Sequence, residues 1–411
     1  MLTALSVKGF NSLRDVTITL PWMSVLFGPN AAGKSNLLDA IQLLTRIGTE
    51  RTLADALSSP IRGHPIESFS FPPGGLPELL SAASASFAIE AALSHKKNRY
   101  RYRVRVAIAP ASGALSVTDE YLTLLAKDGQ PKGVATIEPV EERLRLRRKS
   151  EGGKPRYEHL GQNYAVLSDQ RLGGTLYPPI ESARSELSGW RTYYLDPRVA
   201  MRTSQTPADV RDIGVLGDAI APFLYRLRSE DPKRFAAVAR TLRSIIPSVE
   251  ELSVDLDKRR GILDVQVQQG GIAYSSRIVS EGTLRVLALC SIAANPWGGS
   301  LLAFEEPENG VHPRRLELIA QLLLALALEQ DRQVVVTTHS PLFCDAILKG
   351  ARERPEDVGL FNVRRDGSAT VIQPFNVSGP IFQDHEIAAA LTAGTEDGLF
   401  ESLLLRGLLD E

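Results

Sequence analysis

One stretch of the sequence has the residue types and spacing of a phosphate-binding loop. Gly28–Ser35 reads Gly-Pro-Asn-Ala-Ala-Gly-Lys-Ser and fits the pattern G-x-x-x-x-G-K-[ST] at every fixed position. Glycines let backbone N–H groups turn toward phosphate oxygens without a Cβ in the way, and the start of a following helix adds partial positive charge. We expect Lys34 to reach the β- and γ-phosphates of a nucleotide and the Ser35 hydroxyl to ligate Mg²⁺. The alternative is a chance glycine turn before a helix.

Two adjacent carboxylates end a second apolar run, Leu301–Glu306. Successive strand residues point to opposite faces, so Glu305 and Glu306 can take different roles. One would hold Mg²⁺, usually through water, while the other polarises an attacking water. Because apolar strands often run into acidic turns, this pair gains weight only beside a phosphate loop.

A histidine and a capped helix complete the set of candidates. His339 follows the apolar run 333–338, and ligands bind at the carboxyl ends of strands in a parallel sheet. A lone histidine there is more often a capping or packing residue, so the agreement of three strand ends on one edge favours a shared site. Ser280 can cap a helix and point its N-terminus at an anion, although a plain capped helix is the alternative.

The elements that must position these residues follow from hydrophobic periodicity. The loop lies between a strand, 24–27, and a helix with Leu37, Ile41 and Leu44 on one face. From Ser280 onward the order is helix, strand, helix, strand, helix, which predicts a parallel sheet flanked by helices. Three strand-like runs lie between residues 86 and 125, and helical patterning returns at 210–246. We therefore predict an α/β fold with a mainly parallel core, an antiparallel β subdomain and a largely helical insertion.

Length and composition are consistent with a globular core that an insertion divides. The chain has 411 residues, 43% of them hydrophobic and 23% charged, which excludes wholesale disorder. The phosphate loop lies near residue 30 and the acid pair near residue 305. We expect residues 1–80 to form the first part of the core, 81–275 the β subdomain and insertion, and 276–411 the second part. Two cysteines in apolar stretches, and no signal peptide or membrane-length apolar run, predict a cytoplasmic protein without a membrane partner.

Taken in order, the motifs resemble the ABC-type ATPase head of RecF-like, OLD-like and SMC-like proteins, most closely the stand-alone RecF-type ATPases. The resemblance covers nearly the whole chain. The matching segments are Val7–Leu13 (first strand and turn), Gly28–Ile41 (Walker A loop and helix), Ser280–Gly282 (shortened signature), Leu301–Glu306 (Walker B), Pro307–Pro313 (D-loop) and Thr338–Pro341 (switch histidine).

The resemblance implies ATP and Mg²⁺ as cofactors and a role for each residue. Two heads of a homodimer would sandwich two ATP molecules, with Ser280 and Gly282 acting on the partner's nucleotide. Glu306 would orient the attacking water, Glu305 would be the Mg²⁺-linked acid together with Ser35, and His339 would sense the γ-phosphate. The implied nucleotide-binding residues are Gly28, Asn30, Ala31, Ala32, Gly33, Lys34, Ser35, Asn36, Ser280 and Gly282.

Four departures from the family pattern bear on function. Glu305 stands where many relatives have Asp, which adds a methylene to the proposed metal ligand. No glutamine of the Q-loop can be placed between Pro60 and Pro77. The sequence has no coiled-coil arms, and after His339 it shows no acidic cluster like that of the TOPRIM nuclease in OLD-type proteins. These features predict an ATPase without an attached nuclease.

One segment of the chain is strongly basic, although the net charge of the whole chain is only −1. Lys96–Arg156 contains 15 basic and seven acidic residues, a local excess of eight positive charges. If its first run is a strand, four arginines line one face: Arg99, Arg101, Arg103 and Arg105. A second run, 143–147, repeats the alternation. Such a face could bind the backbone of DNA, or its arginines could pair with cross-strand acids such as Glu90 or Glu141.

Two functions remain open on these grounds. The first is a slow ATPase that dimerises on ATP and couples hydrolysis to DNA engagement, in repair or in defence against invading DNA. The second is a nucleotide-gated switch or scaffold for a separately encoded protein effector, without direct DNA binding. Salt-sensitive DNA binding by the arginine face distinguishes them.

Overall fold

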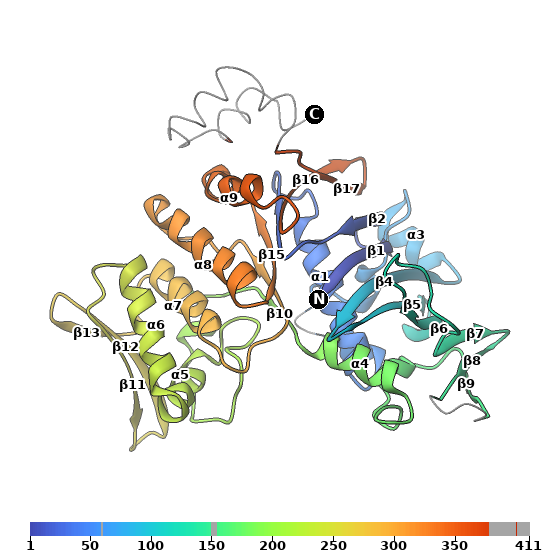
Figure 1. Cartoon of the computed structure of the whole chain (residues 1–411), viewed down its shortest axis with the longest axis horizontal. Helices are drawn as coiled ribbons and strands as arrows, with labels where there is room; N and C mark the ends of the chain where they lie inside the picture. The colour runs from blue at the N-terminus through green and yellow to red at the C-terminus, as the bar shows by residue number, and fades with distance from the viewer. Residues whose placement is uncertain (59–60, 149–153, 378–399, 401–411) are drawn as a thin grey trace. The chain divides into compact units, whose positions relative to one another are not determined.

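The computed structural model describes residues 1–58, 61–148, 154–377 and 400. Pro60 of the region searched for a Q-loop, and Lys149 and Glu151 of the basic segment, lie outside them. The predicted α/β fold is confirmed, with a largely parallel sheet, a large antiparallel sheet and a small third sheet (Figure 1). The chain forms two compact units, each built from separate stretches of sequence.

The first unit comprises residues 1–21, 28–190 and 363–373. Its antiparallel sheet has the strand order β2-β1-β4-β5-β6-β7-β8-β9. These strands are β1 (Leu2–Phe10), β2 (Leu13–Thr19), β4 (Ala85–His95), β5 (Asn98–Ala109), β6 (Ala114–Leu125), β7 (Ile137–Val140), β8 (Arg143–Leu146) and β9 (Arg156–His159). Its helices are α1 (Lys34–Thr49), α2 (Leu53–Ala56), α3 (Gly75–Ser81) and α4 (Pro178–Ser188), with 3-10 turns at Pro65–Ser68 and Val166–Ser168.

Alternation along β5 explains how this sheet packs. Tyr100, Tyr102 and Val104 are buried, whereas Arg99 and Arg105 on the other face are exposed. Helices α1 and α4 contact each other, and α4 contacts β4, β5 and β6, so the two helices cover the apolar face. The sheet is thus buried on one side and carries the arginines on the other, as the alternating sequence predicts.

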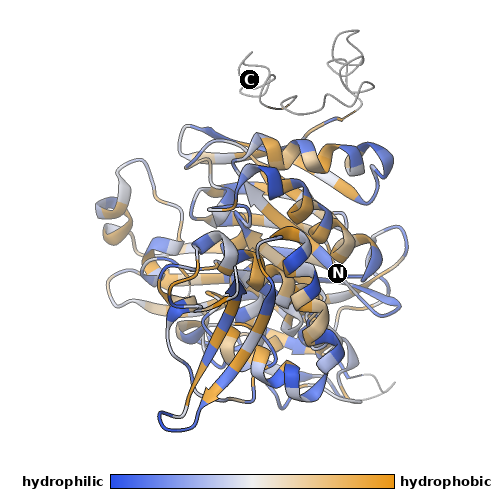
Figure 2. Ribbon diagram, turned by 90° about the vertical axis from the view of Figure 1, so that its left-hand side faces the viewer, coloured by the Kyte–Doolittle hydropathy of each residue, from blue (hydrophilic) through white to orange (hydrophobic). Residues whose placement is uncertain are grey.

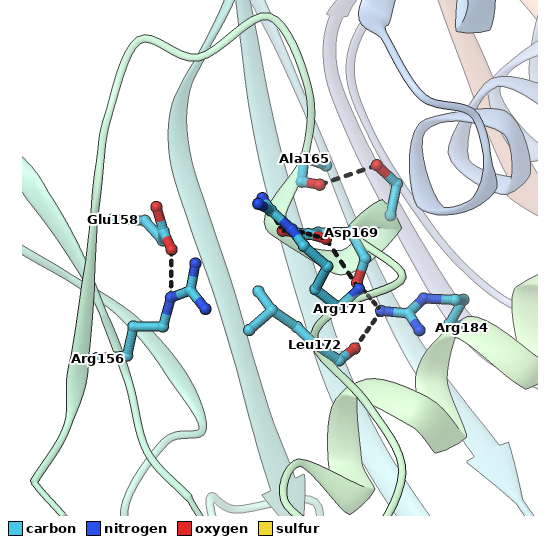
Figure 3. A network of polar contacts seen from close by, with 8 residues as sticks. Arg156, Glu158, Ala165, Asp169, Arg171, Leu172 and Arg184 are labelled. Carbon is cyan, nitrogen blue, oxygen red and sulfur yellow. Dashed lines mark hydrogen bonds and ion pairs between the residues drawn. The ribbon is translucent and has the colours of Figure 1, made fainter.

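A buried arginine fastens the loop after β9 to α4. Arg184, on α4, is 6% exposed and donates to the backbone carbonyls of Asp169 and Leu172 (Figure 3) and to that of Leu167. In the same network Asp169 accepts from Arg171, and that guanidinium holds the pKa of the Asp169 carboxyl below its usual range. The segment between β9 and α4, which has only a short 3-10 turn, is therefore held by side-chain bonds to its carbonyl groups.

The second unit comprises residues 22–27, 191–362 and 374–411, described as far as the ranges above allow. Its main sheet has the order β10-β14-β15-β3-β16-β17. These strands are β3 (Met23–Phe27), β10 (Trp190–Tyr193), β14 (Leu301–Glu305), β15 (Gln333–Thr338), β16 (Val358–Asp366) and β17 (Ala369–Pro374), of which β10, β16 and β17 extend into the first unit. Strands β14, β15, β3 and β16 are mutually parallel.

Helices alternate with these strands, as predicted from Ser280 onward. They are α7 (Glu281–Ala293), α8 (Leu316–Glu329) and α9 (Pro341–Glu353), with a 3-10 turn at Pro313–Arg315. The three-stranded sheet of β11 (Glu251–Asp257), β12 (Ile262–Gln269) and β13 (Ile272–Ser275) packs with α5 (Ile220–Glu230), and α6 (Pro232–Ile245) contacts α5 and α7. Figure 2 shows hydrophilic and hydrophobic bands alternating along strands of this sheet. No helix within the described ranges is long and apolar enough to cross a membrane.

Several elements differ from the sequence prediction. The region 210–219 has no helix, and α5 begins at Ile220. Strand β13 and the hairpin β16–β17 were not predicted, because β13 is short and largely exposed and β17 is only partly apolar. Strand β13 pairs with β12 across a tight turn, and β16 pairs with β3, which is far away in the sequence. The local pattern of these strands is therefore weak.

Candidate active site

The phosphate loop connects the end of β3 to the start of α1. Part of its backbone has positive φ, a conformation that favours glycine. Gly28 has φ 148°, Ala31 63° and Gly33 100°. A Cβ on Gly28 would meet the carbonyl oxygen of Val363 at 2.1 Å, and one on Gly33 would meet Thr370 Oγ1 at 2.0 Å. Both glycines are therefore required by space as well as by conformation.

Lys34 lies folded over this loop. Its Nζ donates to the carbonyl oxygens of Gly28, at 2.8 Å, and Pro29, at 2.9 Å. These two bonds hold the side chain of Lys34, the first residue of α1, against the loop backbone. This is the position from which an ammonium group can contact phosphates that the loop amides bind.

Polar residues from three parts of the first unit, far apart in the sequence, support the loop. The Ser12 and Thr370 hydroxyls are 2.6 Å apart, and Thr370 Oγ1 donates to the carbonyl oxygen of Ala32 at 2.9 Å. Asn36 Nδ2 donates to Ser12 Oγ at 2.6 Å, and Arg365 donates to the Ala31 carbonyl oxygen at 3.3 Å. Asn36 is expected at the nucleotide site from the sequence, whereas Ser12, Thr370 and Arg365 are not, because nothing local connects them to the loop.

A pocket of about 560 Å³ lies in the same unit beside these residues. It is lined by the loop-supporting Ser12, Asn36 and Arg365, by Arg14 and Arg62, and by Asn11, Asp39, Gly63, Glu67, Phe69, Phe71, Pro72, Pro73 and Ser368. The pocket therefore combines cationic, polar and aromatic walls next to a phosphate loop. A larger pocket, about 940 Å³, lies between α8 and α9 and contains none of the candidate catalytic residues.

In the second unit, strand register brings the other candidates to one edge. Phe27, the residue before the loop, pairs with Thr338, the residue before His339. Glu305 pairs with Thr337 on the neighbouring parallel strand. The carboxyl ends of β3, β14 and β15 therefore coincide, which is the edge where parallel sheets bind ligands.

Glu306 occupies a strained and well-held position at this edge. Its φ is 44°, a left-handed conformation that non-glycine residues rarely adopt. Glu306 Oε1 is 3.0 Å from Nδ1 of His339, and Oε2 accepts from Asn309 Nδ2 at 2.7 Å. Its own N–H donates to the Thr337 carbonyl oxygen at 2.9 Å. Strain that surrounding bonds hold in place is typical of functional sites.

The turn after β14 also contains Glu308, a buried carboxylate to which the sequence alone assigns no role. Glu308 is 5% exposed, and burial raises the pKa of its carboxyl. One oxygen accepts from the Thr338 hydroxyl, which itself accepts from the Ser340 N–H at 2.9 Å. Glu308 thus ties the turn after β14 to the end of β15, directly beside His339. Only its place two residues after the acid pair hinted at this role.

The signature-like segment lies against the same turn. Ser280 caps α7, as predicted, by accepting from the Thr283 N–H at 3.2 Å. A Cβ on Gly282 would meet the Gly310 carbonyl oxygen at 2.3 Å, so the start of α7 packs on the D-loop turn at a distance that only glycine allows. Within one chain, the Ser280 segment and the Glu306 turn are neighbours.

Comparison with known proteins identifies the family. A family model described as "AAA domain, putative AbiEii toxin, Type IV TA system" matches residues 23–345. The chain belongs to this AAA family. The match begins at β3, directly before the phosphate loop, and ends within α9, so it includes the phosphate loop, the Ser280 segment, the Glu305–Glu306 pair and His339.

Relatives of this AAA protein extend the comparison. An OLD nuclease of Thermus scotoductus is 23% identical over 391 residues, covering 90% of this chain and 66% of that protein. The chain therefore spans about two thirds of that relative. An SMC head bound to the C-winged helix domain of ScpA is 15% identical, with 92% and 98% of the chains covered and a TM-score of 0.55. An SMC head derived from Pyrococcus furiosus, bound to the C-terminal domain of ScpA, is 13% identical, with 94% and 99% covered and a TM-score of 0.51.

These likenesses confirm the predicted fold and group. The AAA protein has the P-loop ATPase fold of an SMC head, and it resembles the ABC, SMC and RecF-like group.

Proposed function

We propose that this chain is an ATP-hydrolysing head that dimerises when ATP binds and couples slow hydrolysis to DNA engagement, in DNA repair or in defence against invading DNA. The observation that carries the proposal is the geometry of Glu306 at a parallel-sheet edge, where backbone bonds to Thr337 and Asn309 hold its strained backbone and its carboxylate contacts Asn309 and His339. Such a carboxylate is suited to orient water toward a phosphate.

The residues of the loop fit a nucleoside triphosphate. Backbone N–H groups of Ala31–Lys34 and the start of α1 would bind the phosphate oxygens, and Lys34 would exchange its carbonyl partners for the β- and γ-phosphates. The sugar and base would occupy the neighbouring pocket, where Arg14 and Arg62 supply cations and Phe71 an aromatic face.

The Ser35 hydroxyl and the Glu305 carboxylate are each an oxygen ligand of the kind that Mg²⁺ prefers. A bound Mg²⁺ would neutralise charge on the phosphates. Glu306 would accept a hydrogen bond from the attacking water and align it with the γ-phosphorus. His339, hydrogen-bonded to Glu306, would keep that carboxylate in place and sense whether the γ-phosphate is present. Hydrolysis then yields ADP and phosphate.

Binding and hydrolysis can be separated by two variants. Lys34→Ala should lose ATP binding by at least about tenfold in calorimetry, because an ammonium group no longer pairs with the phosphates. Glu306→Gln should bind ATP normally and lose turnover by roughly a hundredfold or more. Arg240→Gln, on the exposed face of α6, is the matched control and should retain both. Unchanged turnover in Glu306→Gln would assign the base to another residue.

The second candidate function is a nucleotide-gated scaffold for a separate protein effector. It is favoured by the pairing of the arginine face: Arg101 and Arg103 lie 3.6 and 3.8 Å from Glu90 oxygens, and Arg103 lies 2.7 Å from Asp119. Paired arginines offer less net charge to a DNA backbone. The ScpA domains bound to the two similar SMC heads add support for a protein partner. ATPase activity that responds to no DNA at low salt would select this function.

A further inference from the structure

A partly buried arginine in the first turns of α7 has no role in the scheme above. Arg285 Nη1 donates to the carbonyl oxygen of Glu306 at 3.5 Å. Its Nε is buried and has no hydrogen-bond partner among the described residues. Arg285 is thus aimed at the strained turn after β14, yet its hydrogen-bonding capacity is only partly used.

The charges around Arg285 come from several segments of the second unit. Burial lowers the pKa of the Arg285 guanidinium from its ordinary value. The charges of Glu308, Glu281, Glu306 and Asp196, in decreasing order of effect, oppose that shift. Glu308 Oε2 is likewise buried without a hydrogen-bond partner in the described part of the chain. Removing either charge would leave the other in a poorly solvated place.

The start of α7 is in direct contact with the turn that carries Glu306. Gly282 packs against the Gly310 carbonyl, one turn of helix before Arg285. The Glu306 carbonyl oxygen accepts from the Asn309 N–H at 3.1 Å as well as from Arg285. A shift of α7 therefore acts on the turn at two points, one steric and one electrostatic.

We propose that Arg285 is a positioning residue that sets the conformation of Glu306 according to the position of the Ser280 end of α7. This inference rests on the proposed function, in which Glu306 orients water. Ligand contact at the N-terminus of α7 would move or fix the helix, and Arg285 would pass that change to the Glu306 carbonyl through a single side chain. The arginine contacts the main chain of Glu306, so it acts through that residue and not on the nucleotide.

The test compares Arg285→Gln, Arg285→Lys and the control Arg240→Gln in steady-state ATP hydrolysis. Arg285→Gln should lower kcat by roughly tenfold or more while KM for ATP and the calorimetric ATP affinity stay within about twofold. Arg285→Lys keeps the charge and should recover part of the loss. Thermal unfolding of each variant establishes that it is folded, and Arg285→Lys remains informative if the glutamine variant is not.

A double variant separates positioning from general damage. Adding Arg285→Gln to Glu306→Gln should cause no further loss of turnover, because the residue through which Arg285 acts is already disabled. A further loss of tenfold, or a wild-type kcat in Arg285→Gln, would overturn the inference. Wild-type turnover in Glu306→Gln alone would instead overturn the assignment of Glu306, whatever the Arg285 variants show.

Discussion

At the scale of single residues, the ionisation of Glu120 has a consequence for stability. Glu120 on β6 is fully buried and accepts from Tyr102 and from the N–H groups of Val166 and Leu167. Burial raises the pKa of its carboxyl to about 7, and the three donors offset only part of that shift. The folded state therefore holds this proton more tightly than the unfolded chain does.

We predict that the first unit loses stability as pH rises from about 5 to 8. The contribution is complete below the unfolded pKa and is lost as pH passes through the folded pKa, at most about 3 kcal/mol for a shift of this size. Urea unfolding at several pH values should show this decline in the wild type and a flatter profile in Glu120→Gln. Glu142→Gln, at an exposed position, should follow the wild type. Parallel profiles for all three proteins would contradict the prediction.

At the scale of elements, the arginines of β5 form two groups, one paired with acidic side chains and one exposed. Arg101 and Arg103 pair with Glu90 or Asp119, whereas Arg99 and Arg105 are exposed on the same face. The cross-strand pairing expected with Glu90 is confirmed. Glu141 lies in the turn between β7 and β8, and Glu138 is the acid that pairs with Arg145, which register places opposite it, and with Arg147, two residues further along the chain.

If the β5 face binds DNA, the exposed arginines should carry most of the affinity. Replacing Arg99 and Arg105 by Gln should weaken duplex binding and reduce the slope of log affinity against log salt by about 2, roughly one per lost phosphate contact. Replacing Glu90 by Gln and Asp119 by Asn should instead tighten binding, because paired arginines become available. Fluorescence anisotropy at several salt concentrations measures both. An affinity that neither pair changes would assign DNA binding to another surface or to none.

At the scale of the whole molecule, one chain supplies a phosphate loop from one unit and the Ser280 helix and Glu306 edge from the other. The proposed sandwich needs a second copy, whose Ser280 would face the nucleotide. We predict that Glu306→Gln with ATP gives a particle of about twice the monomer mass of 44.8 kDa in light scattering.

Variants at Ser280 test that dimer without removing the helix cap. Ser280→Asp keeps a side chain able to cap α7 but adds negative charge toward phosphates, so the dimer should be lost while each monomer still binds ATP. Ser280→Thr keeps both the cap and the neutral hydroxyl and should retain the dimer. A dimer that persists in the aspartate variant would place the interface elsewhere.

The sequence by itself determined the features that depend on local spacing. The phosphate-loop pattern, the strand and helix alternation after Ser280, the helix cap at Ser280 and the two-faced β5 all follow from residues close together in the chain. Each is set by backbone conformation and side-chain periodicity, which a short window contains.

Only the tertiary structure decided which distant residues support them. Thr370 reaches the phosphate loop from more than 300 residues away, Glu308 bonds to Thr338 across two strands, and Arg285 meets the Glu306 carbonyl between a helix and a turn. Such contacts depend on strand register and helix packing, which a pattern of residue types in one segment does not specify. The motifs therefore showed what chemistry to expect, while the fold showed how their side chains are held.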